Sequence, residues 1–162
     1  MMVATTSTSQ GQNEDAESFF KDAELLYRNF DYEEAIPIYD KAIDLDPKEP
    51  KYYLQRGFCK NITQDFEGAI RDFSAVIDLT QDNSYAYVSR GSAKNKSGDF
   101  ASALEDFNKA LEINPKDQEA YNNRGFSKKK LGDKKGACED WYRSKKLGNN
   151  EAKIIIKNNY CK

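Results

Sequence analysis

The apolar positions of this chain recur every 34 residues, and this spacing divides residues 16–151 into four blocks that align without a gap. In each block the fourth and twenty-fourth positions are aromatic, the eighth is small and the twentieth is alanine. The blocks cover residues 16–49, 50–83, 84–117 and 118–151. A repeat of this length predicts pairs of helices that stack on one another, because one pair alone cannot bury its apolar face.

The small residues indicate where the two helices of a block approach each other closely, since bulky side chains would keep them apart. The aromatic residues are expected to fill the remaining space between the helices. The small positions are Ala23, Gly57, Gly91 and Gly125, then Ala35, Ala69, Ala103 and Ala137; the aromatic positions are Phe19, Tyr53, Tyr87 and Tyr121, then Tyr39, Phe73, Phe107 and Trp141.

Polar residues mark the turns between the predicted helices. An aspartate precedes the second helix of every block, where its side chain can cap the free backbone amides. These aspartates are Asp31, Asp65, Asp99 and Asp133. Gly98 and Gly132 come just before two of them and suit the end of a helix, while Pro47 and Pro115 follow a second helix and cannot continue it.

Charged residues at two positions vary together. Three blocks have arginine at the seventh position and aspartate at the twenty-third, whereas the first block has Asp22 and Ile38 there. This match within blocks predicts three ion pairs that are structural rather than catalytic, because partly buried pairs of this kind ordinarily belong to the scaffold. The predicted pairs are Arg56 with Asp72, Arg90 with Asp106 and Arg124 with Asp140.

The two ends of the chain lie outside the blocks. Residues 1–15 are rich in Thr, Ser, Gln and Gly, and we expect a flexible tail without a signal peptide. Residues 152–162 predict a C-terminal capping helix, since the last block would otherwise expose its apolar face. A dimer contact through Ile154 and Tyr160 is the alternative.

The whole pattern resembles the tetratricopeptide repeat (TPR) family, in particular bacterial-type repeats with a C-terminal capping helix. The resemblance implies an all-α fold, a right-handed α-solenoid of four helix-turn-helix repeats plus the cap. Two positions depart from the family. The seventh reads Asp22, Arg56, Arg90 and Arg124, and the eleventh reads Leu26, Lys60, Lys94 and Lys128.

The same resemblance implies a non-catalytic scaffold or adaptor that binds a peptide or helix of a partner protein in a concave groove. Among the residues at the family's contact positions, those expected to form the groove are Phe20, Glu24, Tyr27, Leu54, Phe58, Asn61, Tyr85, Val88, Ser92, Asn95, Lys96, Asn122, Phe126, Lys129 and Lys130. One branch of the family grips the terminal carboxylate of heat-shock chaperones with lysine and asparagine at the fifth and ninth positions. Those positions hold Phe20, Glu24, Leu54, Phe58, Val88 and Ser92, so this clamp is not expected.

Charge is divided unevenly along the chain. Residues 1–83 hold eight basic and seventeen acidic groups, net −9, and residues 84–162 hold seventeen and ten, net +7. The basic half is expected to attract an acidic segment of the partner toward the C-terminal repeats. The acidic half opposes nucleic-acid binding, for which no basic and aromatic interleaving is present. We expect a monomer, and self-association or a structural role in a larger cell-envelope complex is the alternative function.

Catalytic and metal chemistry have little basis in the sequence. Histidine is absent, and the three cysteines do not have metal-site spacing. No enzyme, cofactor or metal is therefore expected. No apolar run is long enough to span a membrane.

The two cysteines nearest the C-terminus, Cys138 and Cys161, bear on the cellular compartment of the protein. If the capping helix runs antiparallel to the helix before it, Cys138 and Cys161 come close, and a disulfide would contribute about 3 kcal/mol. Such a bond would indicate an oxidising compartment such as a bacterial envelope or periplasm, whereas free thiols would suit the cytoplasm. Both readings are open. Cys59 is expected to be a small core residue.

Overall fold

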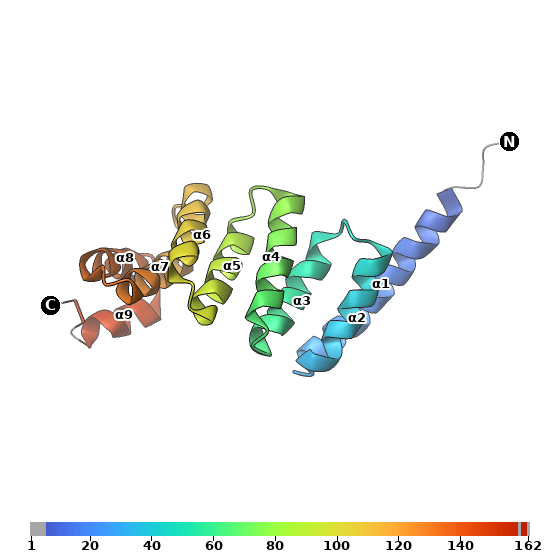
Figure 1. The fold of residues 1–162 in the computed structure, drawn as a ribbon, viewed down its shortest axis with the longest axis horizontal. Helices are drawn as coiled ribbons and strands as arrows, with labels where there is room; N and C mark the ends of the chain where they lie inside the picture. Colours follow the sequence, from blue (N-terminus) through green and yellow to red (C-terminus); the bar gives the residue numbers. More distant parts are fainter. Residues whose placement is uncertain (1–5, 159, 162) are drawn as a thin grey trace. The chain divides into compact units, whose positions relative to one another are not determined.

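The computed structural model describes the backbone of residues 6–158 and 160–161, and the side chains from residue 14 onward in these ranges. These residues contain helices and turns and no strand (Figure 1). The helices are α1 (Thr6–Arg28), α2 (Tyr32–Leu45), α3 (Pro50–Ile62), α4 (Phe66–Thr80), α5 (Ser84–Ser97), α6 (Phe100–Ile113), α7 (Gln118–Lys130), α8 (Lys134–Lys146) and α9 (Asn150–Lys157).

The chain forms two units, residues 1–81 with α1–α4 and residues 82–162 with α5–α9. In the first unit α1 packs on α2, α2 on α3 and α3 on α4. In the second unit each helix packs on the next along the chain, and α5 also contacts α7. Each unit is therefore a stack of antiparallel helix pairs, and the all-α solenoid expected from the repeat is confirmed.

Close contact between small and aromatic residues holds each pair together. A Cβ atom added to Gly91 would lie 2.8 Å from the Phe107 ring, and one added to Gly125 would lie 2.8 Å from the Trp141 indole. Both rings are buried, and the Trp141 Nε1 donates a hydrogen bond to the Asn122 carbonyl oxygen at 3.2 Å. The residue at the eighth position must be small because the aromatic side chain at the twenty-fourth position of the same block occupies the space that a larger side chain would need.

Both ends of the chain differ from the sequence expectation. Helix α1 begins at Thr6, so most of the predicted tail, residues 1–15, is helical, and residues 1–5 lie outside the described residues. Extending a helix that packing has already nucleated costs little, and no proline interrupts this segment. Helix α9 ends at Lys157 rather than continuing to residue 162. Residues 160–161 are in a turn, which brings Cys161 back toward α8.

The turns follow the predicted capping in three blocks and not in the first. The carboxylates of Asp65, Asp99 and Asp133 accept hydrogen bonds from backbone amides three residues later, at 2.8–3.1 Å. Asp31 makes no such bond. The residue three positions after it is Glu34, whereas the other blocks have glycine or serine there. A Cβ atom added to Gly68 or Gly136 would clash with the capping carboxylate, so a larger side chain at this position hinders the cap.

Candidate functional site

Each of the last three blocks contains the same charged network. The Arg90 guanidinium donates to both carboxylate oxygens of buried Asp106, at 3.0 and 2.7 Å. Lys94 adds a third contact to the same carboxylate at 2.8 Å. The equivalent residues form Arg56, Asp72 and Lys60 in the second block, and Arg124, Asp140 and Lys128 in the fourth.

The structure thus brings together all three arginine–aspartate pairs predicted from the sequence. In each block a lysine also contacts the aspartate. The lysines stand at the eleventh position, which departs from the family pattern, and the first block has Leu26 in that place. Their co-occurrence with the arginine and aspartate was the signal that sequence reasoning missed. Burial disfavours charge on Arg56, but its hydrogen bonds to Asp72 outweigh this and raise the Arg56 pKa. Each network joins the two helices of its block through the buried aspartate.

The predicted groove residues divide by burial. Phe20 and Val88 are only 8% and 5% exposed, and Asn122 is also buried, so these three do not form part of an exposed groove. Phe20 lies between the rings of Tyr39 and Tyr52, at centroid distances of 5.9 and 5.1 Å. The fifth position faces a neighbouring helix at Phe20 and Val88, and burial of these apolar side chains stabilises them more than a place on the surface. The residues that stay half-buried or exposed are Glu24, Tyr27, Leu54, Phe58, Asn61, Tyr85, Ser92, Asn95, Lys96, Phe126, Lys129 and Lys130.

A cleft of about 260 Å³ lies between α5 and α7 in the second unit. It is lined by Ser92, Asn95, Lys96, Asn123 and Phe126, and all but Asn123 are among the predicted groove residues. The cleft therefore joins predicted residues of the third and fourth blocks into one surface. Asn123 stands at the sixth position of its block, which the positions taken from the family did not include.

Hydrogen bonds between α5 and α7 fix the polar lining of this cleft. The Asn123 Nδ2 donates to the Ser92 Oγ at 3.3 Å, and the Asn95 Nδ2 donates to the Asn123 carbonyl oxygen at 3.3 Å. Ser127 Oγ, fully buried, donates to the Asn95 Oδ1 at 2.8 Å. The Asn123 Oδ1 accepts no hydrogen bond from a described residue, so it can accept one from a ligand.

The apolar part of the cleft is Phe126, which is 39% exposed. Its ring contacts Phe100 at a centroid distance of 6.2 Å, and the Lys130 Nζ lies 5.4 Å from its centroid. These contacts cover part of the ring, and the rest is exposed to solvent. The cleft thus combines an aromatic ring, amide groups and lysines, and groups of this kind can bind a peptide.

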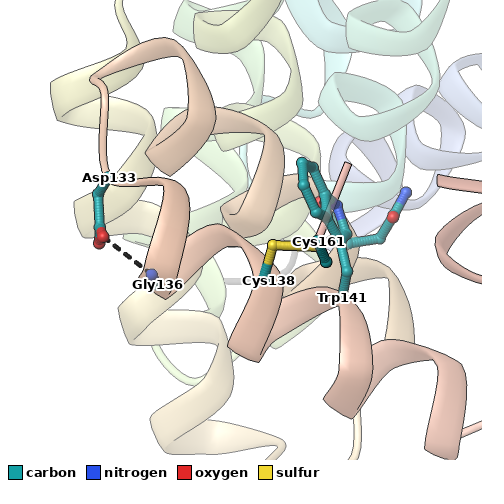
Figure 2. Close-up of a disulfide and its surroundings, with 6 residues drawn as sticks. Asp133, Gly136, Cys138, Trp141 and Cys161 are labelled. Carbon is teal, nitrogen blue, oxygen red and sulfur yellow. Dashed lines mark hydrogen bonds between the residues drawn. A yellow bond between two sulfur atoms is a disulfide. The ribbon is translucent and has the colours of Figure 1, made fainter. Parts of the chain in front are cut away.

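The C-terminal end of the second unit is closed by a disulfide between Cys138 of α8 and Cys161 (Figure 2). The two Cα atoms are 5.5 Å apart. Tyr160, next to Cys161, packs against the buried Trp141 at a centroid distance of 5.2 Å. Ala152, Ile155 and Ile156 pack in the same cluster, so α9 and the turn after it cover the last helix pair. Tyr160 belongs to this cap, while Ile154 remains exposed.

The third cysteine, Cys59, takes no part in the disulfide. Cys59 is buried in the core of the first unit, and this burial raises the pKa of its thiol to about 11. Among the described residues no group of His, Cys, Asp or Glu side chains is placed to hold a metal ion. No helix within those same ranges has the length and apolar character that crossing a membrane requires.

Comparisons with known proteins agree with this architecture. Family models described as TPR repeat and tetratricopeptide repeat match residues 91–132 and 16–49. Among solved structures, MamA (41-end) from Desulfovibrio magneticus RS-1 is similar with a TM-score of 0.79 and 21% identity, over 86% of this chain and 78% of that one. A comparison with curated protein sequences found no match.

Two other similar structures are single TPR domains. The first TPR of Spaghetti (RPAP3), bound to the HSP90 peptide SRMEEVD, has a TM-score of 0.70 and 25% identity, over 74% of this chain and 95% of that one. The Arabidopsis OM64 TPR domain has a TM-score of 0.69 and 24% identity, over 73% and 98% of the two chains.

Proposed function

Because this chain is a tetratricopeptide repeat protein, we propose that it is a non-catalytic scaffold that binds an extended segment of a partner protein in the cleft between α5 and α7. Repeats of this family are typically non-catalytic interaction modules, and the RPAP3 domain with its bound peptide is an example of the fold holding a peptide. Fold analogy supports this class of function and does not identify the ligand. The observation that carries the proposal is the cleft itself, which combines predicted residues of two blocks.

The lining of the cleft favours a particular kind of segment. Phe126 offers an apolar contact, and partly exposed aromatic rings are frequent anchors in protein interfaces. Asn95 and Asn123 can exchange hydrogen bonds with the backbone of an extended peptide. Lys96 lines the cleft and Lys130 adjoins Phe126, which favours an acidic residue close to the apolar one. We therefore expect a partner segment with an apolar side chain followed or preceded by Asp or Glu.

The chaperone tail bound by RPAP3 is not the expected ligand. The positions that would supply the cationic clamp here include Phe20 and Val88, which are buried and apolar. Glu24 at another of these positions is a carboxylate, and it pairs with Arg28 at 3.6 Å. These residues offer no positive charge to a terminal carboxylate. Binding in this chain is expected to rely on the α5–α7 cleft and on an internal segment of the partner.

The test is a selection of peptides on the full chain, followed by affinity measurements with variants. Phe126→Ser and Asn123→Ala should each weaken the selected peptide about tenfold, as removal of an anchor of about 1.4 kcal/mol would. Leu79→Ser is the matched control, because Leu79 is similarly exposed but does not line the cleft. Circular dichroism confirms equal helicity. Equal affinity for the wild-type chain and the Phe126→Ser variant would place the binding surface elsewhere.

The disulfide bears on where the scaffold works. Bonds of this kind persist in oxidising compartments and are rare where glutathione keeps thiols reduced. We propose an oxidising compartment, such as a bacterial periplasm, for this chain. Thiol titration of the denatured protein taken from its native source without reductant should find one free thiol, that of Cys59. Three free thiols would refute the assignment.

A further inference from the structure

A second pocket lies in the first unit, where the turn between α1 and α2 meets the turn between α3 and α4. Its volume is about 390 Å³. Its apolar lining includes Phe30, which is 77% exposed, and Ile62, which is 45% exposed. Asp31, Glu33 and Glu34 line it as well. The pocket thus offers exposed apolar groups beside three carboxylates.

The backbone at Phe30 adopts a conformation that is unfavourable for an aromatic residue. Phe30 has φ 68°, in the left-handed region, at the same place in its turn where Gly98 and Gly132 have φ 93° and 87°. The same pair of hydrogen bonds closes all three turns, for example Asp31 N–H to the Leu26 carbonyl and Asp133 N–H to the Lys128 carbonyl. Aromatic residues rarely adopt this conformation, and although the ring meets that of Tyr32 at a centroid distance of 6.2 Å, Phe30 is still 77% exposed. The strain is therefore not compensated by burial within the described chain.

The carboxylates of this pocket are not used by the fold either. Asp31 does not cap α2, unlike its equivalents in the other blocks. Glu33 and Glu34 form no ion pair with any residue that the structure describes. Three carboxylates without partners attract a basic group, and they repel an acidic one such as the segment expected in the α5–α7 cleft.

A surface with the opposite properties lies on the same chain, in the turn between α7 and α8. Leu131 in this turn is 49% exposed, and Lys129, Lys130, Lys134 and Lys135 surround it in the sequence. These four lysines are exposed and form no ion pair within the described ranges. The carboxylate in this turn, that of Asp133, is engaged in capping α8. The turn therefore presents an apolar side chain among an excess of cations, which complements exposed apolar groups among anions.

We propose that the α7–α8 turn of one copy of this chain docks in the pocket formed by Phe30 and Ile62 on a second copy. Leu131 would contact the apolar lining, and Lys134 and Lys135 would face Asp31, Glu33 and Glu34. The contact joins two different surfaces, so each bound copy keeps one free pocket or one free turn, and association continues head to tail. One turn in one pocket buries little area, so the contact is weak and depends on concentration and salt.

Sedimentation velocity of the full chain tests this proposal. At low ionic strength the average sedimentation coefficient should rise with concentration, and about 0.5 M salt should remove the rise, since charges are then screened within a few ångströms. The charge of the pocket is reversed by Glu33→Lys with Glu34→Lys, and that of the turn by Lys134→Glu with Lys135→Glu. Either double variant should associate only at concentrations at least about tenfold higher than the wild-type chain. Glu67→Lys is the matched control: Glu67 is the equivalent of Glu33 in the second block, and it does not line the pocket.

Two further measurements distinguish docking from a general effect of charge. An equimolar mixture of the two reversed variants should associate again, because the basic turn of one then meets the acidic pocket of the other. Phe30→Gly should abolish association while leaving helicity unchanged, since glycine already occupies this place in the third and fourth blocks. A wild-type chain that stays monomeric at low salt, or a mixture that fails to associate, would overturn the proposal. Lys134, Lys135 and Phe30 lie outside the α5–α7 cleft, so peptide binding should survive all these variants.

Discussion

Opening the bond between Cys138 and Cys161 should release the C-terminal end of the chain from Trp141. The two cysteines are 23 residues apart in the sequence, and closing a loop of this size contributes about 3 kcal/mol in the chain-entropy model. Tyr160, adjacent to Cys161, is held against the Trp141 ring, so loss of the bond acts directly on the indole. With a urea m-value of about 1–3 kcal/mol per M, the midpoint of unfolding at this end should fall by about 1–3 M.

Trp141 is the single tryptophan of the chain, so its fluorescence reports on this end alone. Urea unfolding would be followed by this signal for the oxidised chain, the chain with reductant, and the Cys138→Ser, Cys161→Ser variant. The last two should coincide, and adding reductant to the variant should change nothing. In a stacked array the effect stays local, so helix loss in the first unit should be less affected. Identical midpoints for the oxidised and reduced chains would refute the reasoning.

Three other predictions rest on single features. Asp106→Ala should lower the free energy of unfolding by about 3–5 kcal/mol in denaturant, because it removes the carboxylate that Arg90 and Lys94 share in a partly buried site. A triple variant with the first block's residues, Arg90→Asp, Lys94→Leu and Asp106→Ile, should lose less stability than Asp106→Ala, and an equal or larger loss would contradict this. Burial raises the pKa of the Cys59 thiol to about 11, so the protonated thiol contributes fully to the free energy of unfolding below its ordinary pKa of about 9, and this contribution is lost as pH rises toward 11. The free energy of unfolding should fall by about 2–3 kcal/mol over this range, and an equal fall in a Cys59→Ala variant would exclude the thiol as the cause. Calorimetric titration with the peptide SRMEEVD should show no affinity that depends on its terminal carboxylate, and micromolar binding lost on amidation would disprove it.

The arrangement of helix pairs could be predicted from the sequence because it depends on positions that every block shares. The alanine at the twentieth position and the aromatic residue at the twenty-fourth are buried in all four blocks, for example Ala103 and Phe107 in the third. Packing at these positions leaves little freedom, so a pattern repeated four times is enough to define it. The ion pairs followed from the same comparison, since the first block lacks both the arginine and the aspartate.

The groove was less predictable, because the exposure of a side chain depends on the helix packed beside it as well as on its position in the block. The fifth position holds Phe20 and Val88, and both enter the core because a neighbouring helix offers them an apolar surface. Asn123 could not be singled out, since its role depends on hydrogen bonds to α5 that no pattern within one block reveals. The sequence does not determine whether the disulfide forms, because an antiparallel cap predicts that Cys138 and Cys161 approach each other but does not predict their oxidation.

Differences between equivalent positions point to the surfaces on which the proposed functions depend. A position that only supports the stack can carry the same residue in every block, as alanine does at the twentieth position. Phe30 replaces a glycine that would fit its backbone without strain, and Phe126 stands where the third block has Ser92. Neither replacement fills the core, since both residues are exposed and their rings contact other partly exposed side chains such as Tyr32 and Phe100. Large apolar residues that the fold neither requires nor buries are the ones whose removal should leave the array intact and change what it binds.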